Sequence, residues 1–457
     1  METSTNVMHP NANRLFYGSC FALITTAFSF AIAAGILDQL IVELELTASQ
    51  GGLITSMWFL GFPISMVIGG LIYHKVGGKS IMQFAFFAHG IGILLLIFSG
   101  SYMLLLVANL LIGLGNGCTE AACNPMIADA YRGNRMSKML NRFHMWFPGG
   151  IAIGSLLSGL MTNMGILGQD QVWLLLIPTL IYAFLFFGQD WPKAKVEEAA
   201  ALGSNFKALL SPLFLFIGAC MALTAISEFG PNQWVGLILA KSGANPYLIL
   251  ALTAGLMAVA RFFGGDMVAK FNVTGVLLGS AILATIGIYL FSTQTGAMAY
   301  VAAIIFALGI AYFWPNMIGF VADKIPKSGA LGMSIVGAIG MFANSIFQPI
   351  IGSWIDADVN EKSNEILDVS GETFNEAKRL FEEDDMAKAA DLLQISENNL
   401  NSTIDLVVLE SGQQTLETMT IFPGILIVLF TILYFWMRNR KATTKAEAQP
   451  AEPATSM

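Results

Sequence analysis

The sequence contains little charge and few residues suited to metal or disulfide chemistry. Only 12% of its 457 residues are charged, about half the share of an ordinary soluble domain. Cys20, Cys118, Cys123 and Cys220 lie in apolar runs without the spacing of a zinc site or a disulfide framework. We therefore expect no metal site. The net charge of −8 gives no case for binding nucleic acid.

Motifs for ATP-driven transport and for catalysis are also missing. The sequence has no nucleotide-binding motif of the form GxxxxGKS/T, and no nucleophile is evidently paired with a base. These absences argue against an ATP-driven pump and against an enzyme, and no cofactor is expected.

Apolar residues, in contrast, make up 55% of the chain, and the mean hydropathy is +0.66. A helix that spans a membrane needs about 20 mostly apolar residues, and the sequence offers twelve such runs. It therefore predicts an all-α polytopic membrane protein. The expected spans are residues 16–40, 52–74, 80–99, 102–128, 143–165, 171–189, 207–239, 246–269, 273–292, 298–322, 330–354 and 418–437.

Positive charge between the spans sets the expected orientation. Lysines and arginines gather in alternate connections, whereas the short connections on the other side hold only Lys241. By the positive-inside rule, both termini are expected in the cytoplasm. We expect a monomer in the plasma membrane, which in a bacterium is the inner membrane.

Two polar segments divide the chain. Residues 190–206 are expected to link an N-terminal half, residues 1–189, to a C-terminal half, residues 207–437, with six spans each and a cytoplasmic tail at 438–457. Residues 355–417 are rich in acid and are expected to form an outer loop with one or two short helices. This loop is interpreted as a tolerated insertion, with a lid or a docking site as the alternative.

Similar connections recur in the two halves. GGLIYHKVGGKS after the second span is echoed by RFFGGDMVAKFNVTG after the eighth, as expected of parallel six-helix repeats. The first of these loops resembles the loop signature of the major facilitator superfamily. Gly70, Lys75, Gly77 and Lys79 match it, and His74 stands where the family usually has Asp. The resemblance implies the major facilitator fold and a gating role for these residues.

One acid lies deep within the fourth span. Asn116, Glu120 and Asn124 follow Asn109 at offsets of 7, 11 and 15 residues, which places all four within about 80° of arc on a helix. An ionisable group at bilayer depth is costly and tends to face a cavity. Glu120 is therefore interpreted as a proton carrier, with a permanently protonated carboxyl bonded to a neighbouring helix as the alternative. Pro125 can free a backbone carbonyl one turn earlier.

This stretch, LGNGCTEAACNPMI, resembles the fourth helix of the fucose and hexose proton symporters. The resemblance implies that Glu120 couples transport to protons and that Asn124 and Pro125 are the Asn-Pro pair of that family. It also offers Asp38 as a second coupling acid, with a solvated carboxylate at the membrane rim as the alternative. Arg261, in VARFFGG, resembles a position where the family makes a charge contact between helices, which implies a gating or structural role.

Other polar residues on the predicted spans are candidates for a central cavity. Amides and acids bond sugar hydroxyls, while an aromatic ring covers the C–H face of a sugar. Helix-helix hydrogen bonding is the alternative, and for His144 a gate. The candidates for substrate contact are Asn116, Asn124, Asn141, His144, Glu228, Asn232, Gln233, Trp234, Trp314, Asn316, Asn344 and Gln348.

These features predict a secondary active transporter that carries a monosaccharide, a hexose or deoxyhexose, into the cell together with a proton. Alternating access would come from rocking the two halves around a midplane site. An exporter of amphipathic compounds, a sodium-coupled sugar carrier and a transporter-like nutrient sensor remain as alternatives. The sequence leaves the sugar open.

Overall fold

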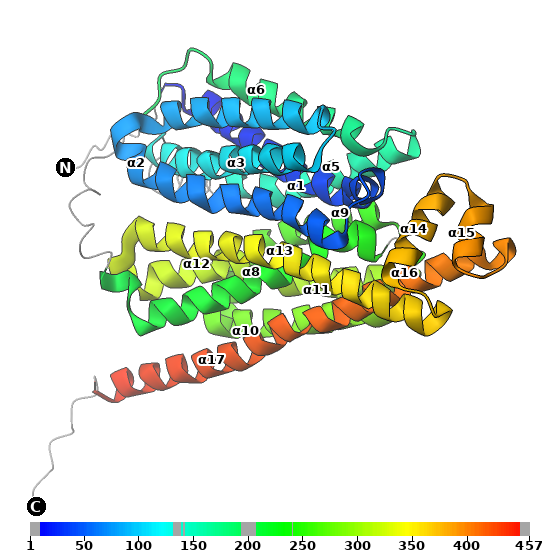
Figure 1. The fold of residues 1–457 in the computed structure, drawn as a ribbon. Helices are drawn as coiled ribbons and strands as arrows, with labels where there is room; N and C mark the ends of the chain where they lie inside the picture. The colour runs from blue at the N-terminus through cyan, green and yellow to red at the C-terminus, as the bar shows by residue number, and fades with distance from the viewer. Residues whose placement is uncertain (1–9, 131–138, 140–141, 193–206, 240, 448–457) are drawn as a thin grey trace, which may run out of the picture.

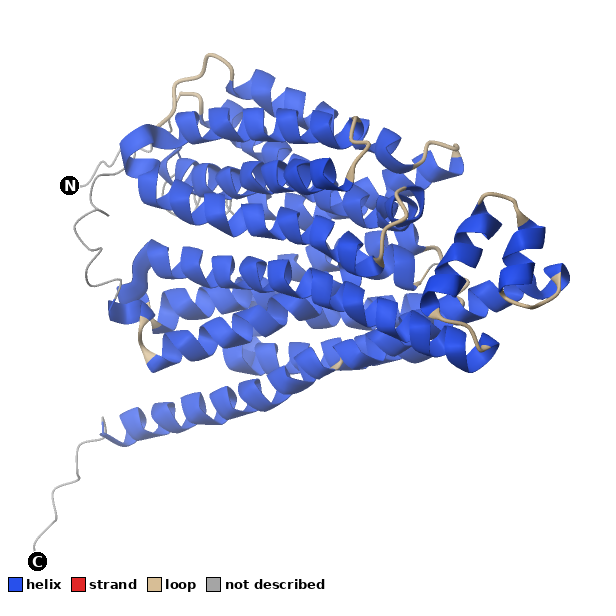
Figure 2. Ribbon diagram, viewed as in Figure 1, coloured by secondary structure: helices blue, strands red, loops and turns tan. Residues whose placement is uncertain are grey.

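The computed structural model describes residues 10–130, 139, 142–192, 207–239 and 241–447. Within these ranges every regular element is a helix (Figure 2). The helices form two groups that run roughly along one common axis (Figure 1). Most of the expected link between the halves, residues 193–206, lies outside the described residues.

The first group belongs to the N-terminal half, and the second to the C-terminal half. The N-terminal half contains α1 (Ala12–Glu43), α2 (Ala48–Ile97), α3 (Tyr102–Ala130), α5 (Trp146–Asn163), the 3-10 helix η1 (Gly168–Leu175) and α6 (Leu176–Phe186). The C-terminal half contains α8 (Pro212–Ile238), α9 (Pro246–Phe262), α10 (Gly264–Thr293), α11 (Ala297–Ile310), α12 (Phe313–Lys324), the 3-10 helix η3 (Pro326–Ser328), α13 (Gly329–Leu367) and α17 (Ile421–Glu447). Between α13 and α17 lie α14 (Gly371–Glu382), α15 (Met386–Leu392) and α16 (Glu397–Met419).

The predicted spans are found as helices. Among the described residues, eleven helices are long and apolar enough to cross a membrane, and the shorter apolar helix Pro246–Arg261 occupies the place of the expected eighth span. Together they account for the twelve predicted spans and for two groups of six. The chain is therefore a multi-pass membrane protein.

Several helices run through points where the sequence suggested an end. In α2 the chain turns between the second and third spans at Gly77, whose φ of +76° lies in the region that favours glycine. In α10 the turn falls at Asn272, with φ +58°, and its side chain accepts from the backbone N–H of Gly275 at 3.0 Å to start the next helix. The tenth span is broken at Ala311 and Tyr312 into α11 and α12.

An apolar stripe faces outward along the second part of α2. Phe84, Phe87, Ile91, Leu94 and Phe98 are all exposed, and they recur every three or four residues. This spacing places them on one side of a helix. An exposed apolar stripe of this length suits contact with lipid rather than with water.

The helices between α13 and α17 project from one end of the bundle, on the right in Figure 1. We call residues 369–408 the outer cap, because they have a small core of their own that includes Phe374, Ala389 and Leu400. The short helices α14 and α15 agree with the expected one or two short helices. The rest of the expected loop continues α13 and α16 as long helices instead. The opposite end of the bundle is where α1 begins and α17 ends.

Phe374 is fully buried in the core of the outer cap. Replacing a buried phenylalanine by alanine leaves a cavity and typically costs about 3–5 kcal/mol. Because this core is small, we expect Phe374→Ala to open the outer cap while the bundle stays folded. Trypsin should then cleave faster after Arg379 and Lys388. Leu406→Ala, at a position 42% exposed, is the control, and equal cleavage rates in all proteins would contradict the expectation.

Candidate functional site

A partly exposed carboxylate lies on α3. The side chain of Asn124, one turn along, donates from Nδ2 to Oε2 of Glu120 at 2.6 Å. Glu120 takes part in none of the ion pairs found between described residues. Oδ1 of Asn124 is buried and has no hydrogen-bond partner in the part of the chain that the structure describes. Among the described residues, the carboxylate is thus held by an amide and not by a cation.

A buried polar network joins five spans of the N-terminal half. His89 on α2 is fully buried, with Nδ1 3.0 Å from the hydroxyl of Tyr182 and Nε2 3.0 Å from Oδ1 of Asn116. Asn116 donates to Oγ of Ser29 at 3.3 Å, and Trp58 donates to the same oxygen at 2.8 Å. Since an amide oxygen only accepts, the arrangement fits a neutral histidine protonated on Nε2. In this conformation Asn116 helps to hold α1, α2, α3 and α6 together.

Sequence reasoning missed this network. The signal that could have found it is His89 in the apolar run FAFFAHGIGILLLI, because a buried imidazole needs a partner at each nitrogen. Of the candidates on the predicted fifth span, His144 is exposed and its ring lies 5.0 Å from that of Phe143. Asn141 lies outside the described residues.

An ion pair lies inside the C-terminal half. Nη2 of Arg261 on α9 lies 3.3 Å from Oε1 of Glu228 on α8, and the two side chains are 19% and 4% exposed. Nε of Arg261 donates to the carbonyl of Ala311 at 3.0 Å. Pro315, four residues later, has no N–H to bond that carbonyl. Asn232 donates to the backbone carbonyl of Glu228 at 2.8 Å, so it is a helix contact in this conformation.

Several amides of the C-terminal half lack partners. Trp234 donates to Oε1 of Gln348 at 2.8 Å, but Nε2 of Gln348 has no partner among the described residues. The same holds for Nε2 of Gln233, Oδ1 of Asn344 and Nδ2 of Asn316, each of which is buried. A buried polar group left unsatisfied costs about 1–3 kcal/mol. Such groups indicate a place where water or a ligand is bound.

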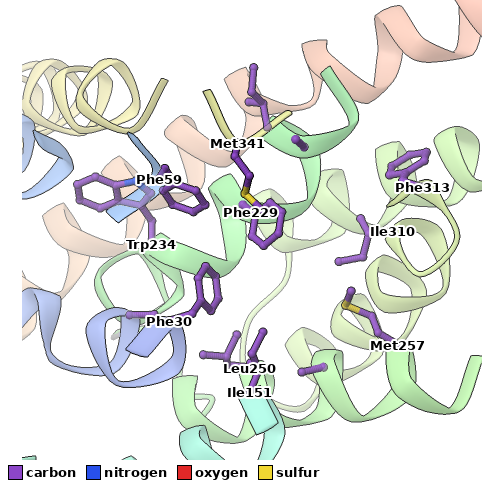
Figure 3. Packing of buried hydrophobic residues seen from close by; sticks show 14 of the residues in the cluster. Phe30, Phe59, Ile151, Phe229, Trp234, Leu250, Met257, Ile310, Phe313 and Met341 are labelled. Carbon is purple, nitrogen blue, oxygen red and sulfur yellow. The ribbon is translucent and has the colours of Figure 1, made fainter. Parts of the chain in front are cut away.

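Aromatic rings fill the centre between the two halves. The ring of Phe229 lies 5.6 Å from that of Phe30 and 5.5 Å from that of Phe59, measured between centroids. These three side chains converge in Figure 3. On the other side, Phe229 lies 6.3 Å from Trp314. The predicted polar residues therefore form separate clusters around an apolar centre: Glu120 with Asn124, Glu228 with Arg261, and Trp234 with Gln348.

The halves approach closely where α2 packs against α13. Oγ of Ser56 donates to the carbonyl of Ser345 and lies 3.2 Å from Oγ of the same residue. That carbonyl is open because Pro349, four residues later, has no N–H. A side chain at Gly52 or Gly352 would clash with the backbone of the other helix. Small residues thus permit this contact, as they do between other membrane helices.

Further contacts join the halves toward the outer-cap end. The carboxylate of Asp356 on α13 accepts from the backbone N–H groups of Ala48 and Ser49, each at 2.9 Å, and so caps the first turn of α2. The hydroxyl of Tyr247, at the start of α9, donates to the carbonyl of Gly35 on α1 at 3.0 Å. These bonds hold the outer-cap end of the bundle closed.

The outer cap adds ion pairs across the same interface. Lys378 lies 3.4 Å from Asp38 of α1, and Arg379 lies 3.5 Å from Glu45. Burial lowers the pKa of Lys378, but the carboxylates of Asp38 and Glu382 outweigh this effect and hold its pKa above the usual value. Asp38, considered as a coupling acid from the sequence, is thus at the rim and bonded to the outer cap.

The loop signature lies at the turn in α2. Lys75 and Lys79 are exposed on either side of Gly77, where the chain reverses. Around Gly70 a side chain would find open space. His74 is helical, and its side chain is outside the described part of the structure.

Comparisons with known proteins place the chain in context. A family model described as Major Facilitator Superfamily matches residues 19–348. The sialic acid transporter NanX of Escherichia coli strain K12 is 21% identical over 365 residues, which cover 76% of this chain and 88% of NanX. The hexuronate transporter of Bacillus subtilis strain 168 is 27% identical over 168 residues, 35% of this chain and 38% of that protein. Among solved structures, a bacterial homologue of the human lysosomal transporter Spinster, inward-facing and unoccupied, matches with a TM-score of 0.74 at 16% identity, covering 93% of this chain and 97% of its own.

The contact between Ser56 and Ser345 can be tested by a cross-link. With the four native cysteines, all buried, replaced by serine, we expect Ser56→Cys with Ser345→Cys to form a disulfide under mild oxidation, because the two Oγ atoms are 3.2 Å apart. Mass spectrometry of the joined peptides measures it. Ser56→Cys with Ser353→Cys is the control, since Ser353 is exposed on another side of α13. Equal yields from both pairs would contradict the observed packing.

Proposed function

Because this chain belongs to the Major Facilitator Superfamily, we propose that it is a secondary transporter that takes up a sugar together with a proton. The names of NanX and of the hexuronate transporter identify carriers of sugars, which supports this substrate class. The finer assignment to a proton-coupled monosaccharide importer rests on the residues of the chain itself.

The observation that carries the proposal is Glu120 on α3, partly exposed and bonded to Asn124 at 2.6 Å. A carboxylate in a spanning helix without a cation beside it is costly when ionised and dry, and much less costly when water reaches it. In this proposal Glu120 takes a proton from outside and releases it to the cytoplasm.

Alternating access supplies the change in surroundings. The halves are held together at the outer-cap end by Asp356, Tyr247 and the contact of Ser56 with Ser345. If the opposite end faces the cytoplasm, as the loop charges favour, this conformation is closed to the outside and inward-facing. Parting of the same contacts would open the carrier outward while the other end closes.

The sugar would bind between the halves, on the C-terminal side of the aromatic centre. Gln233, Asn344 and Gln348 each have a buried amide group without a partner among the described residues. Such groups gain hydrogen bonds when a hydroxyl reaches them. In this proposal the ring of Trp314, next to Phe229, covers the apolar face of the sugar.

Coupling is tested by Glu120→Gln in proteoliposomes. A glutamine keeps the size and the bond to Asn124 but cannot carry a proton. We expect accumulation of sugar driven by a proton gradient to be lost, while exchange of labelled sugar at equal pH on both sides continues. Glu372→Gln, at an exposed position of α14, should leave both unchanged.

If the Glu120→Gln variant still accumulates sugar in response to a proton gradient, Glu120 is not the residue that couples transport to protons. Uptake driven by a sodium gradient and not by a proton gradient would instead assign the cation to sodium. A wild-type protein that exchanges neither neutral nor acidic sugars would refute sugar transport itself.

A further inference from the structure

Glu228 and Arg261 make an ion pair whose geometry is poor for a purely structural contact. A single hydrogen bond of 3.3 Å joins them. Strong arginine-carboxylate pairs are shorter and usually bidentate. Two charges removed from water need good geometry to offset the loss of hydration. A single long contact between nearly buried groups therefore leaves much of the guanidinium's capacity unused.

The guanidinium is nevertheless held firmly in place. Nε donates to the carbonyl of Ala311, which Pro315 leaves open at the break between α11 and α12. The hydroxyl of Tyr312 bonds the carbonyl of Ala260, next to Arg261, at 3.1 Å. Of the five N–H donors of an arginine, those on Nη1 make no hydrogen bond to a described residue. One edge of a fixed, planar cation is thus available.

An aromatic ring and a buried amide belong to other helices of the same half. Trp314, three residues after Ala311, packs against Gly340 of α13. One turn further, Asn344 is fully buried, and its Oδ1 has no partner among the described residues. Phe229, the neighbour of Glu228, touches Trp314 from the other side at 6.3 Å. The fixed cation, the aromatic ring and the open amide oxygen thus come from α9, α12 and α13 of the same half.

We propose that Arg261 binds the carboxylate of an acidic monosaccharide, which replaces Glu228 as its partner while Glu228 takes up a proton. This proposal rests on the proposed function and narrows its substrate to sugar acids. The planar fork of arginine matches a carboxylate with two parallel bonds, which Glu228 does not make. With the carboxylate on Arg261, the ring of the sugar extends toward Trp314 and its hydroxyls toward Asn344. In the empty carrier Glu228 keeps the cation paired, so that Arg261 is never left alone at bilayer depth.

The full-length chain in proteoliposomes provides the test, with d-glucuronate and d-galacturonate as the acidic probes and d-glucose and d-galactose as the neutral ones. Each probe competes for counterflow exchange. We expect the wild-type protein to prefer the uronates. Arg261→Gln should weaken uronate competition about 10- to 100-fold and weaken competition by any neutral sugar that is exchanged far less. Arg261→Lys should restore part of the uronate affinity, because it keeps the charge but not the fork.

Two further variants distinguish a loss of binding from misfolding. Arg261→Gln alone leaves Glu228 buried without its cation, so Arg261→Gln with Glu228→Gln is made as well, and it should fold and still lack the preference. Glu228→Gln alone should tighten uronate competition, because the competing carboxylate is gone. A wild-type protein that exchanges glucose or galactose and ignores both uronates would overturn the inference and leave sugar transport intact. So would equal losses for acidic and neutral sugars in the double variant.

Discussion

Inside a membrane no water is present to bond a backbone carbonyl that a proline has released, so the protein must supply a donor. Two such carbonyls organise this transporter. Pro349 opens the carbonyl of Ser345, and the hydroxyl of Ser56 reaches it from the other half. Pro315 opens the carbonyl of Ala311, and Arg261 reaches it from α9.

The two solutions have different consequences. The serine contact crosses between the halves, and it is one of several single hydrogen bonds to backbone groups at that interface. Each such bond contributes only about 0.5–1.5 kcal/mol net, and water can take over either partner when the halves part. The arginine contact stays within one half and can persist through the cycle, which gives the guanidinium a fixed position. The bonds between the halves can thus be exchanged for water, whereas the bond of Arg261 to Ala311 does not require the halves to stay together.

Composition was sufficient to predict the spans, because every membrane helix carries its apolar length in its own sequence. The spacing of residues along the sequence was also sufficient to single out Glu120 and Asn124, since residues four apart lie next to each other on a helix. The pairing of Glu228 with Arg261 could not be predicted in the same way. The partners lie on different helices, and their contact depends on the rotation of each helix about its axis.

The same reason explains what was missed. His89 meets Tyr182 and Asn116 only after α2, α3 and α6 have packed together. Asp38 was considered as a coupling acid or a rim carboxylate. Its partner Lys378 lies in the outer cap, and the apolar runs that predict the spans do not predict how this segment folds. The outer cap was expected to be a loop with short helices. Instead, α13 extends beyond the apolar part of the eleventh span, and α16 precedes the apolar part of the last span as a long helix.

One of those flanking helices has a mechanical consequence. Residues Glu397–Arg438 form a nearly continuous helix of 42 residues, which at 1.5 Å per residue is a rod of about 60 Å. Its first part belongs to the core of the outer cap, and its last part crosses the bundle as α17. A tilt of about 10° at one end moves the other by about 10 Å. The rod therefore links the outer cap mechanically to the far end of the bundle, so that a displacement of one would be carried to the other.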